Sequence, residues 1–265
     1  GARGANGVIL ITTKGGHEGK GKVSYNSYFG VKDITKTFDM LDPYEFVYWQ
    51  RELLYPGTTF EQYYGAFGDI DLYKQLKGTN WQEELFGRTG TSMYHNLSFS
   101  GGSKTSKYNI SLTRNDEEEI MLGSGFGRTN LNIKTVTQLK DWLSVDLNVM
   151  LSDNLQKGAG TYRNYTLSYI GYRPTKGLSD FVDPELVSAG DYEAGATYNL
   201  DPVQMTNDSY RRSKSLSFNF SGALNIKLTK NLQHRFEYGS TYGENTTKFF
   251  YGIHTPMFKT MEGYH

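Results

Sequence analysis

Apolar and polar residues alternate along much of this 265-residue chain. The clearest stretch has leucine or valine at every second position from 143 to 151, with mostly polar residues between them. A period of two places alternate side chains on opposite faces of an extended strand, so the stretch predicts a β-strand with one aliphatic and one polar face. Six further segments follow the same rule. The predicted strands cover residues 22–31, 93–101, 107–114, 128–134, 143–151, 216–228 and 233–242.

The connections between these strands alternate between short and long. Short turns follow the second, fourth and sixth strands, at residues 102–105, 140–141 and 230–231. Long connections follow the first, third and fifth strands, at residues 33–91, 115–125 and 153–213. In an up-and-down antiparallel sheet, this order places all the short turns at one end. Outer-membrane barrels have that asymmetry, with short periplasmic turns and long extracellular loops.

A soluble β-sandwich would show the same alternation, because any half-buried sheet does. Loop length favours the barrel, since unstructured connections longer than about 15 residues are uncommon in compact soluble domains. A Lys or Arg facing lipid near mid-bilayer costs about 2–4 kcal/mol, and the aliphatic faces of the first, fifth and sixth strands carry no charge in their interiors. The sequence predicts an all-β fold: a partial up-and-down transmembrane β-barrel of about seven strands with two long extracellular loops.

Helix signals occur within the first long connection. Asp42 followed by Pro43 is a good N-cap and first helical position, and the residues after it continue a helical pattern. A second short helix is expected over residues 69–76. The connection after the fifth strand, rich in Gly, Pro and Tyr, is expected to be irregular.

Composition excludes several classes of protein. The 28 basic residues balance the 28 acidic ones, and no basic patch stands out, so nucleic acid is not an expected partner. The absence of cysteine excludes disulfides and thiolate zinc sites. The mean hydropathy is −0.58. No run approaches the roughly 18 apolar residues that a helical membrane span needs.

No constellation of residues points to catalysis, a cofactor or a metal ion. Glycines at positions 1, 4 and 7 suggest a phosphate cradle, but the strand-like run 8–12 follows them, whereas a dinucleotide fold needs the strand first. The acidic run 116–119 lacks the alternate-residue spacing of a calcium loop, which favours a solvated charge run. The histidines lack metal-ligand spacing. The sequence therefore predicts a protein that is not an enzyme and holds no cofactor.

The chain opens with Gly-Ala-Arg-Gly-Ala-Asn-Gly-Val-Ile-Leu-Ile-Thr-Thr-Lys. This stretch resembles the end of the plug domain in TonB-dependent outer-membrane transporters of the SusC/RagA family, which reads G-x-R-G-A-N-G-V-I-x-I-T-T-K. The plug-end motif here consists of Gly1, Arg3, Gly4, Asn6, Gly7, Thr12, Thr13 and Lys14. The resemblance continues over nearly the whole chain, at residues 22–31, 80–86, 95–102 and 125–128.

The resemblance implies how the chain is organised. Residues 1–21 are expected to be the C-terminal end of a plug domain with its link. Residues 22–265 are expected to be the N-terminal portion of a barrel of about 22 strands. The remaining strands and the TonB-contact segment then lie elsewhere in a longer protein. The polar strand positions are expected to face the lumen and the plug: Asn109, Asn130, Asn132, Lys134, Asp146, Asn219, Arg235 and Glu237.

The resemblance also implies a function. Such proteins take up large nutrients across the Gram-negative outer membrane, powered through TonB, with oligosaccharides the first expected substrate class and peptides the alternative. The expected partners are a SusD-like lipoprotein at the extracellular face, TonB and outer-membrane lipid. Two other classes share parts of the pattern: a soluble carbohydrate-binding β-sandwich and a plugless structural or adhesin barrel. The match over residues 1–14 disfavours the second of these.

Overall fold

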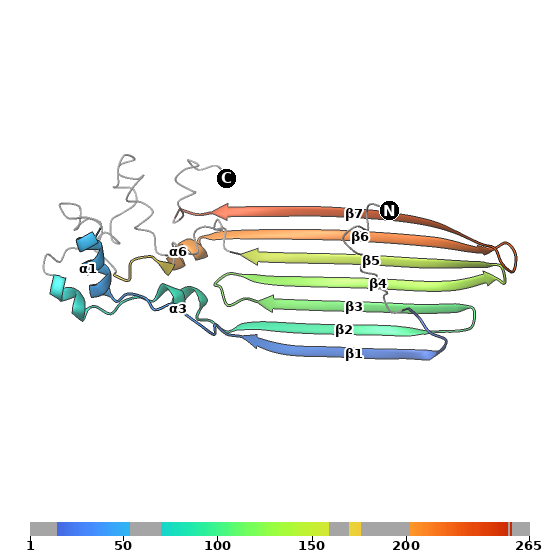
Figure 1. Cartoon of the computed structure of the whole chain (residues 1–265), viewed down its shortest axis with the longest axis horizontal. Helices are drawn as coiled ribbons and strands as arrows, with labels where there is room; N and C mark the ends of the chain where they lie inside the picture. The colour runs from blue at the N-terminus through green and yellow to red at the C-terminus, as the bar shows by residue number, and fades with distance from the viewer. Residues whose placement is uncertain (1–14, 54–69, 159–169, 176–201, 254, 256–265) are drawn as a thin grey trace.

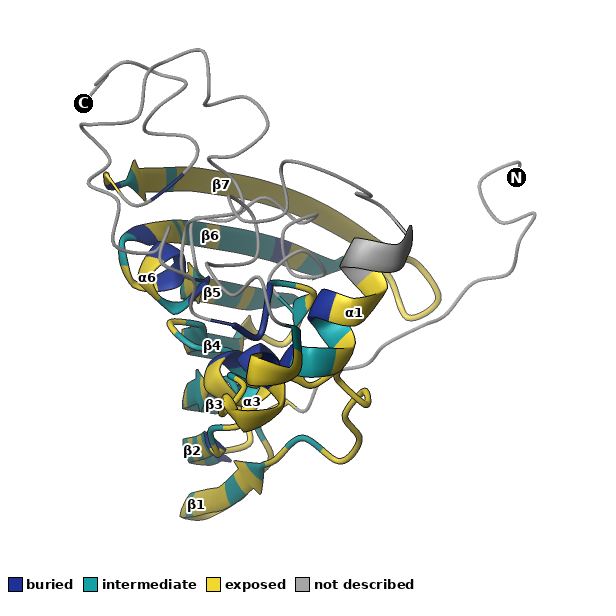
Figure 2. Cartoon of the chain, turned by 90° about the vertical axis from the view of Figure 1, so that its left-hand side faces the viewer, coloured by how far each residue is buried: buried dark blue, intermediate teal, exposed yellow. Residues whose placement is uncertain are grey.

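The computed structural model describes residues 15–53, 70–158, 170–175, 202–253 and 255. Within them the strands form one seven-stranded antiparallel sheet in the order of the chain (Figure 1). The strands are β1 (Gly19–Lys32), β2 (Gly90–Gly102), β3 (Ser106–Glu118), β4 (Gly125–Lys140), β5 (Leu143–Gly158), β6 (Ser209–Lys227) and β7 (Gln233–Tyr251). Figure 2 shows this sheet from one end as a curved wall. The predicted all-β, up-and-down fold of seven strands is confirmed.

Helices gather at one end of the sheet (Figure 1). They are α1 (Pro43–Leu53), the 3-10 helix η2 (Ile70–Gln75), α3 (Trp81–Phe86) and α6 (Pro202–Asn207). The short turns between β2 and β3, β4 and β5, and β6 and β7 lie at the opposite end, as the alternation of connection lengths predicts. None of the helices in the described residues combines the length and apolarity needed to cross a bilayer.

The strand register brings the aliphatic positions of all strands onto one face. Successive pairing partners form a continuous apolar row of Tyr25, Leu97, Leu112, Leu131, Leu151, Phe218 and Tyr242. The row of pairing partners next to this one, one residue away on every strand, is mostly polar. It consists of Asn26, Asn96, Thr113, Asn130, Ser152, Ser217 and Gly243. Because neighbouring side chains alternate across a strand, these rows lie on opposite faces. The sheet therefore has an aliphatic face and a polar face.

The aliphatic face is not covered within the described structure. Exposed fractions reach 64% for Phe29, 62% for Val23 and 59% for Tyr238. A β-sandwich would bury such side chains against a second sheet. The described residues form a single sheet, so this part of the chain does not build a sandwich. A contiguous exposed apolar face that extends over seven strands marks a surface that contacts a membrane or an apolar partner.

The strands extend further toward the helical end than the alternation predicted. The connection after β3 was predicted over residues 115–125 but spans only 119–124, and the connection after β5 spans 159–208 instead of 153–213. The reason lies in the side chains there. Arg114, Asp116 and Asp153 stand on the aliphatic parity, so the alternation ends while the backbone ladder continues. Two long connections remain, after β1 and β5.

The predicted N-cap of α1 is confirmed. The Glu45 N–H donates to Asp42 Oδ1 at 2.7 Å, and the Asp42 N–H donates to Glu45 Oε2 at 3.1 Å. This reciprocal pair is a capping box, which satisfies two backbone donors at once. The second predicted helix is the 3-10 helix η2. Tyr73 of η2 packs with Val47 of α1, and both are fully buried.

Two short helices were not predicted. Asn80 caps α3 by accepting from the Gln82 and Glu83 N–H groups at 3.1 and 3.3 Å. Leu85 of α3 then packs with Met205 of α6 in a second small core. The cap residue was the available signal for α3. For α6 it was Pro202, which fits the first position of a helix.

A tyrosine covers glycines at the short-turn end of the sheet. A Cβ on Gly101 would lie 2.9 Å from Gly21 Cα and 3.1 Å from Tyr108 Oη, and one on Gly21 would lie 3.1 Å from Tyr108 Oη. The Tyr108 hydroxyl therefore occupies the space that side chains at these positions would need. Glycines in adjacent strands are commonly stabilised by an aromatic neighbour in this way.

We expect Gly101→Val to destabilise the intact protein by about 1–3 kcal/mol, because the added carbons overpack against Tyr108 and β1. Gly239→Val is the matched control, since a Cβ there meets only the Phe220 carbonyl oxygen at 3.8 Å. Thermal denaturation of both variants in detergent is the measurement. An equal melting temperature for the two valine variants would contradict the packing argument.

Candidate functional site

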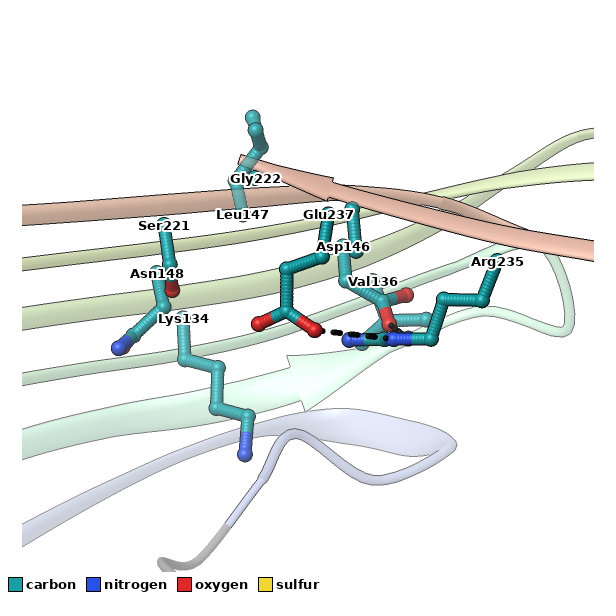
Figure 3. Close-up of a pocket in the computed structure, with 10 residues that line it drawn as sticks. Lys134, Val136, Asp146, Leu147, Asn148, Ser221, Gly222, Arg235 and Glu237 are labelled. Carbon is teal, nitrogen blue, oxygen red and sulfur yellow. Dashed lines mark hydrogen bonds and ion pairs between the residues drawn. The ribbon is translucent and has the colours of Figure 1, made fainter. Parts of the chain in front are cut away.

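The polar face of the sheet carries a charged cluster near the short-turn end. It surrounds an open hollow built from β4, β5, β6 and β7 (Figure 3). Lys134, Asp146, Arg235 and Glu237 line the hollow with Val136, Leu147, Asn148, Ser221, Gly222 and Ala223. Four of the positions predicted to face the lumen therefore meet at one place.

Arg235 is the centre of the cluster. Its Nη1 donates to Asp146 Oδ2 at 2.8 Å and to Asn225 Oδ1 at 2.7 Å, and its Nε donates to Glu237 Oε2 at 3.2 Å. Asn225 Nδ2 in turn donates to Asp146 Oδ2 at 3.1 Å and to Ser144 Oγ at 3.3 Å. One guanidinium thus joins β5, β6 and β7 through charge-assisted bonds. Figure 3 shows the bonds to Asp146 and Glu237 as dashed lines.

The other predicted positions lie on the same face outside the hollow. Asn109 is the pairing partner of Lys134, and Asn132 lies between Ser111 and Met150. Thr241 Oγ1 donates to Asn219 Oδ1 at 2.9 Å. Asn130 stands in the polar row described above. The plug-end motif, residues 1–14, lies outside the described residues.

Several members of the network were not among the predicted site residues. Asn225 Nδ2 donates both to Asp146 Oδ2 and to Ser144 Oγ, and Asn96 Nδ2 donates to Thr113 Oγ1 at 2.8 Å. All share the polar parity of their strands, which was the signal available. Periodicity gives the face of a residue, but only the register says which residues on that face touch.

The acidic run 116–119, at the end of β3, is paired with cations. Lys32 bonds to Glu117, and its Nζ lies 3.0 Å from Glu119 Oε1. Arg114 bonds to Asp116, and Arg88 Nη2 lies 3.6 Å from Glu118 Oε2. The prediction of a charge run that is merely solvated was therefore too simple. No group of three potential metal-ligating side chains occurs in the part of the chain that the structure describes.

Comparison with known proteins identifies relatives of one kind. The chain is 30% identical over 161 residues to TonB-dependent receptor P3 of Formosa agariphila, which covers 61% of this chain and 14% of that receptor. It is 30% identical over 163 residues to TonB-dependent receptor SusC of Bacteroides thetaiotaomicron, covering 61% of this chain and 15% of that protein. The chain thus spans about a seventh of the length of these relatives. No protein-family model matches it.

Solved structures show the same fold. The RagAB peptide importer in its closed-closed state matches with a TM-score of 0.70, covering 94% of this chain and 31% of that one at 21% identity. The sequence relatives and this fold confirm the predicted resemblance to SusC/RagA-type TonB-dependent receptors. The relatives are receptors and transporters and not enzymes.

We expect a double-mutant cycle to show coupling between Arg235 and Asp146. Each single change, Arg235→Gln or Asp146→Asn, should destabilise the intact protein by about 1 kcal/mol, because the pair is partly exposed and screened by solvent. The double variant should lose less than the sum, since each single change already removes the interaction. Chemical denaturation in detergent is the measurement. Strict additivity would show that the bond contributes nothing.

Proposed function

We propose that this chain is part of a TonB-dependent outer-membrane transporter, a relative of the SusC/RagA-type receptors, that imports large polar nutrients. Its described strands form a section of the barrel wall. The observation that carries the proposal is the two-faced sheet, with its uncovered aliphatic face and its hydrogen-bonded polar face. The sequence relatives point to the same class of protein.

The aliphatic face fits a lipid environment. Around its middle, Val149 pairs with Ile133 and Phe220, which leaves a band without charged side chains. Bilayer-spanning barrels carry an outward apolar band about 25 Å tall. The two long connections then lie on the extracellular side, where a SusD-like lipoprotein is the proposed partner. The short turns lie in the periplasm.

The polar face fits a lumen that holds a plug. We assign residues 1–21 to the end of that plug and its link, and residues 22–265 to the barrel. The Arg235 cluster lies at the short-turn end, the side toward which TonB pulls. Hydrogen bonds to exposed charged and amide side chains can be exchanged for water at little net cost, so they can hold a plug that must move.

Toward the helical end of the polar face, aromatic and amide side chains on β1, β2 and β3 suit the binding of oligosaccharides. Tyr28 and Tyr94 stack with ring centroids 5.0 Å apart, and they pair across β1 and β2. Amide side chains neighbour them on the polar parity, including Asn26, Asn96 and Asn115. Aromatic faces stack on sugar rings and amides both donate and accept hydrogen bonds, which is what hydroxyl-rich substrates need. We therefore name oligosaccharides as the substrate class.

We expect Val149→Arg to reduce assembly of the full-length protein strongly, because an arginine at mid-bilayer on the lipid face costs about 2–4 kcal/mol. Asn148→Arg, one residue away on the polar face, is the matched control and should assemble normally. The measurement is the amount of heat-modifiable, folded protein in outer-membrane fractions. Equal loss in both variants would show that the aliphatic face does not contact lipid.

Uptake by cells tests the activity itself. In cells that depend on this transporter for growth, we expect labelled oligosaccharides to accumulate, and accumulation to stop when TonB is deleted or the proton gradient is collapsed. Binding to the cell surface should persist, since it needs no energy. Accumulation of labelled peptides and not of oligosaccharides would show that peptides are the substrate class. Accumulation without TonB would overturn the proposed mechanism.

A further inference from the structure

A row of cations crosses three strands on the aliphatic side of the sheet, near its helical end. Lys157 of β5 pairs directly with Arg212 of β6, and Arg212 pairs directly with Lys248 of β7. All three belong to the same parity as Leu151, Phe218 and Tyr242, which lie in the apolar row. Neither strand pair has a register shift, so the three cations lie on the same face of the sheet, the aliphatic one.

These like charges stand together without an ion-pair partner among the described residues. Side chains directly opposite on neighbouring strands lie close together, and like charges there are destabilising. All three are exposed. Anions bound beside such a row would relieve the repulsion between its charges.

The neighbouring side chains add to the positive field and offer aromatic surface. Lys214 lies on the same face one step nearer the apolar band, where its Nζ is 3.9 Å from Asp153 Oδ1. One step beyond the row, Tyr210 and Phe250 pair and stack with ring centroids 5.4 Å apart. The Arg212 guanidinium lies 5.0 Å from the centre of the Tyr210 ring. The patch therefore combines cations with an exposed aromatic platform.

Carboxylates on this face do not cancel the row. Asp153 and Glu244 are both aligned with Leu216, in the register between the apolar row and Lys214. Glu244 lies near the Tyr242 hydroxyl at 3.5 Å. Both carboxylates are therefore nearer the band than the three cations, and four cations face two carboxylates over this part of the wall.

The position of the three cations along the membrane normal indicates which part of the lipid they contact. Lys157 is eight residues beyond Val149, which lies near the middle of the aliphatic face; this is about 26 Å along the strand and about 19 Å along the membrane normal at a usual strand tilt. Long Lys and Arg side chains also reach back toward the membrane surface. The cations thus lie at the level of headgroups and not at that of acyl chains.

We propose that Lys157, Arg212 and Lys248 bind the phosphorylated sugar headgroup of a lipopolysaccharide in the outer leaflet. The cations hold phosphate groups, and the Tyr210–Phe250 pair stacks on a sugar ring beside them. This inference rests on the proposed function, because it requires the aliphatic face to be embedded in the outer membrane.

The test compares full-length protein purified from outer membranes with the variant Lys157→Gln/Arg212→Gln/Lys248→Gln. We expect the variant to bind added lipopolysaccharide at least about tenfold more weakly, since each cation near an anionic surface contributes to binding. Two controls should retain binding: Arg211→Gln, which removes the adjacent inward-facing cation, and the charge-preserving Lys157→Arg/Arg212→Lys/Lys248→Arg. Bound lipid is counted by native mass spectrometry, and affinity is measured from the rise in melting temperature.

Separate arms identify the ligand. Lipopolysaccharide stripped of its phosphates should stabilise the protein no more than detergent does, and inorganic phosphate alone should give a much smaller shift. Equal shifts for inorganic phosphate and lipopolysaccharide would overturn the assignment to lipid. Unchanged lipid binding in the triple Gln variant would also overturn it, as would a changed oligomeric state with unchanged lipid. Failure of the wild-type protein to reach the outer membrane at all would instead refute the proposed function.

Discussion

The shared register of the seven strands is the constraint on which the rest of the structure depends. Side chains alternate with a period of two, so a slip of one residue in any pair would move a whole strand's aliphatic set onto the polar face. The short turns at residues 103–105, 141–142 and 228–232 hold three of the six pairs in place. The apolar row from Tyr25 to Tyr242 exists only because every pair is in register. Each functional feature, the Arg235 cluster included, inherits its position from that alignment.

Sequence periodicity predicted the strands and their faces but not where the strands end. Apolar and polar residues alternate only where one face of the strand meets an apolar environment, so the alternation stops where that environment ends. Backbone hydrogen bonds do not depend on side-chain polarity, so β5 continues through Asp153 to Gly158 with charged residues on its outward face. The six-residue helices α3 and α6 were missed for a related reason. They are too short to show a period, and they are held by the contact between Leu85 and Met205, which no local pattern reveals.

The candidate site shows the same limit. Parity placed Asp146, Arg235 and Glu237 on one face correctly, because that requires only counting along each strand. Parity could not show that Arg235 meets Asp146, since the two lie on β7 and β5 with β6 between them, and their meeting requires two correct registers. Asn225 stands between them on β6 and completes the network. The face of a sheet is a local property, whereas a cluster on it is a property of the pairing.

The two ends of the chain's structure depend on different surroundings. At the helical end the connections pack on one another: the Trp81 indole N–H donates to the Arg173 carbonyl at 2.8 Å, and the Leu122 N–H donates to the Leu85 carbonyl at 2.9 Å. Buried apolar side chains there form cores of their own. The seven-stranded sheet, in contrast, has backbone hydrogen bonds between its strands but nothing that covers its aliphatic face within the described residues. Phe236 on that face is 57% exposed. In water that face would favour association, because burying apolar area is the main driving force available to it. Acyl chains would remove that driving force, because they are as apolar as the side chains that they would contact. The connections do not depend on such a change of medium, since they bury apolar side chains in cores of their own.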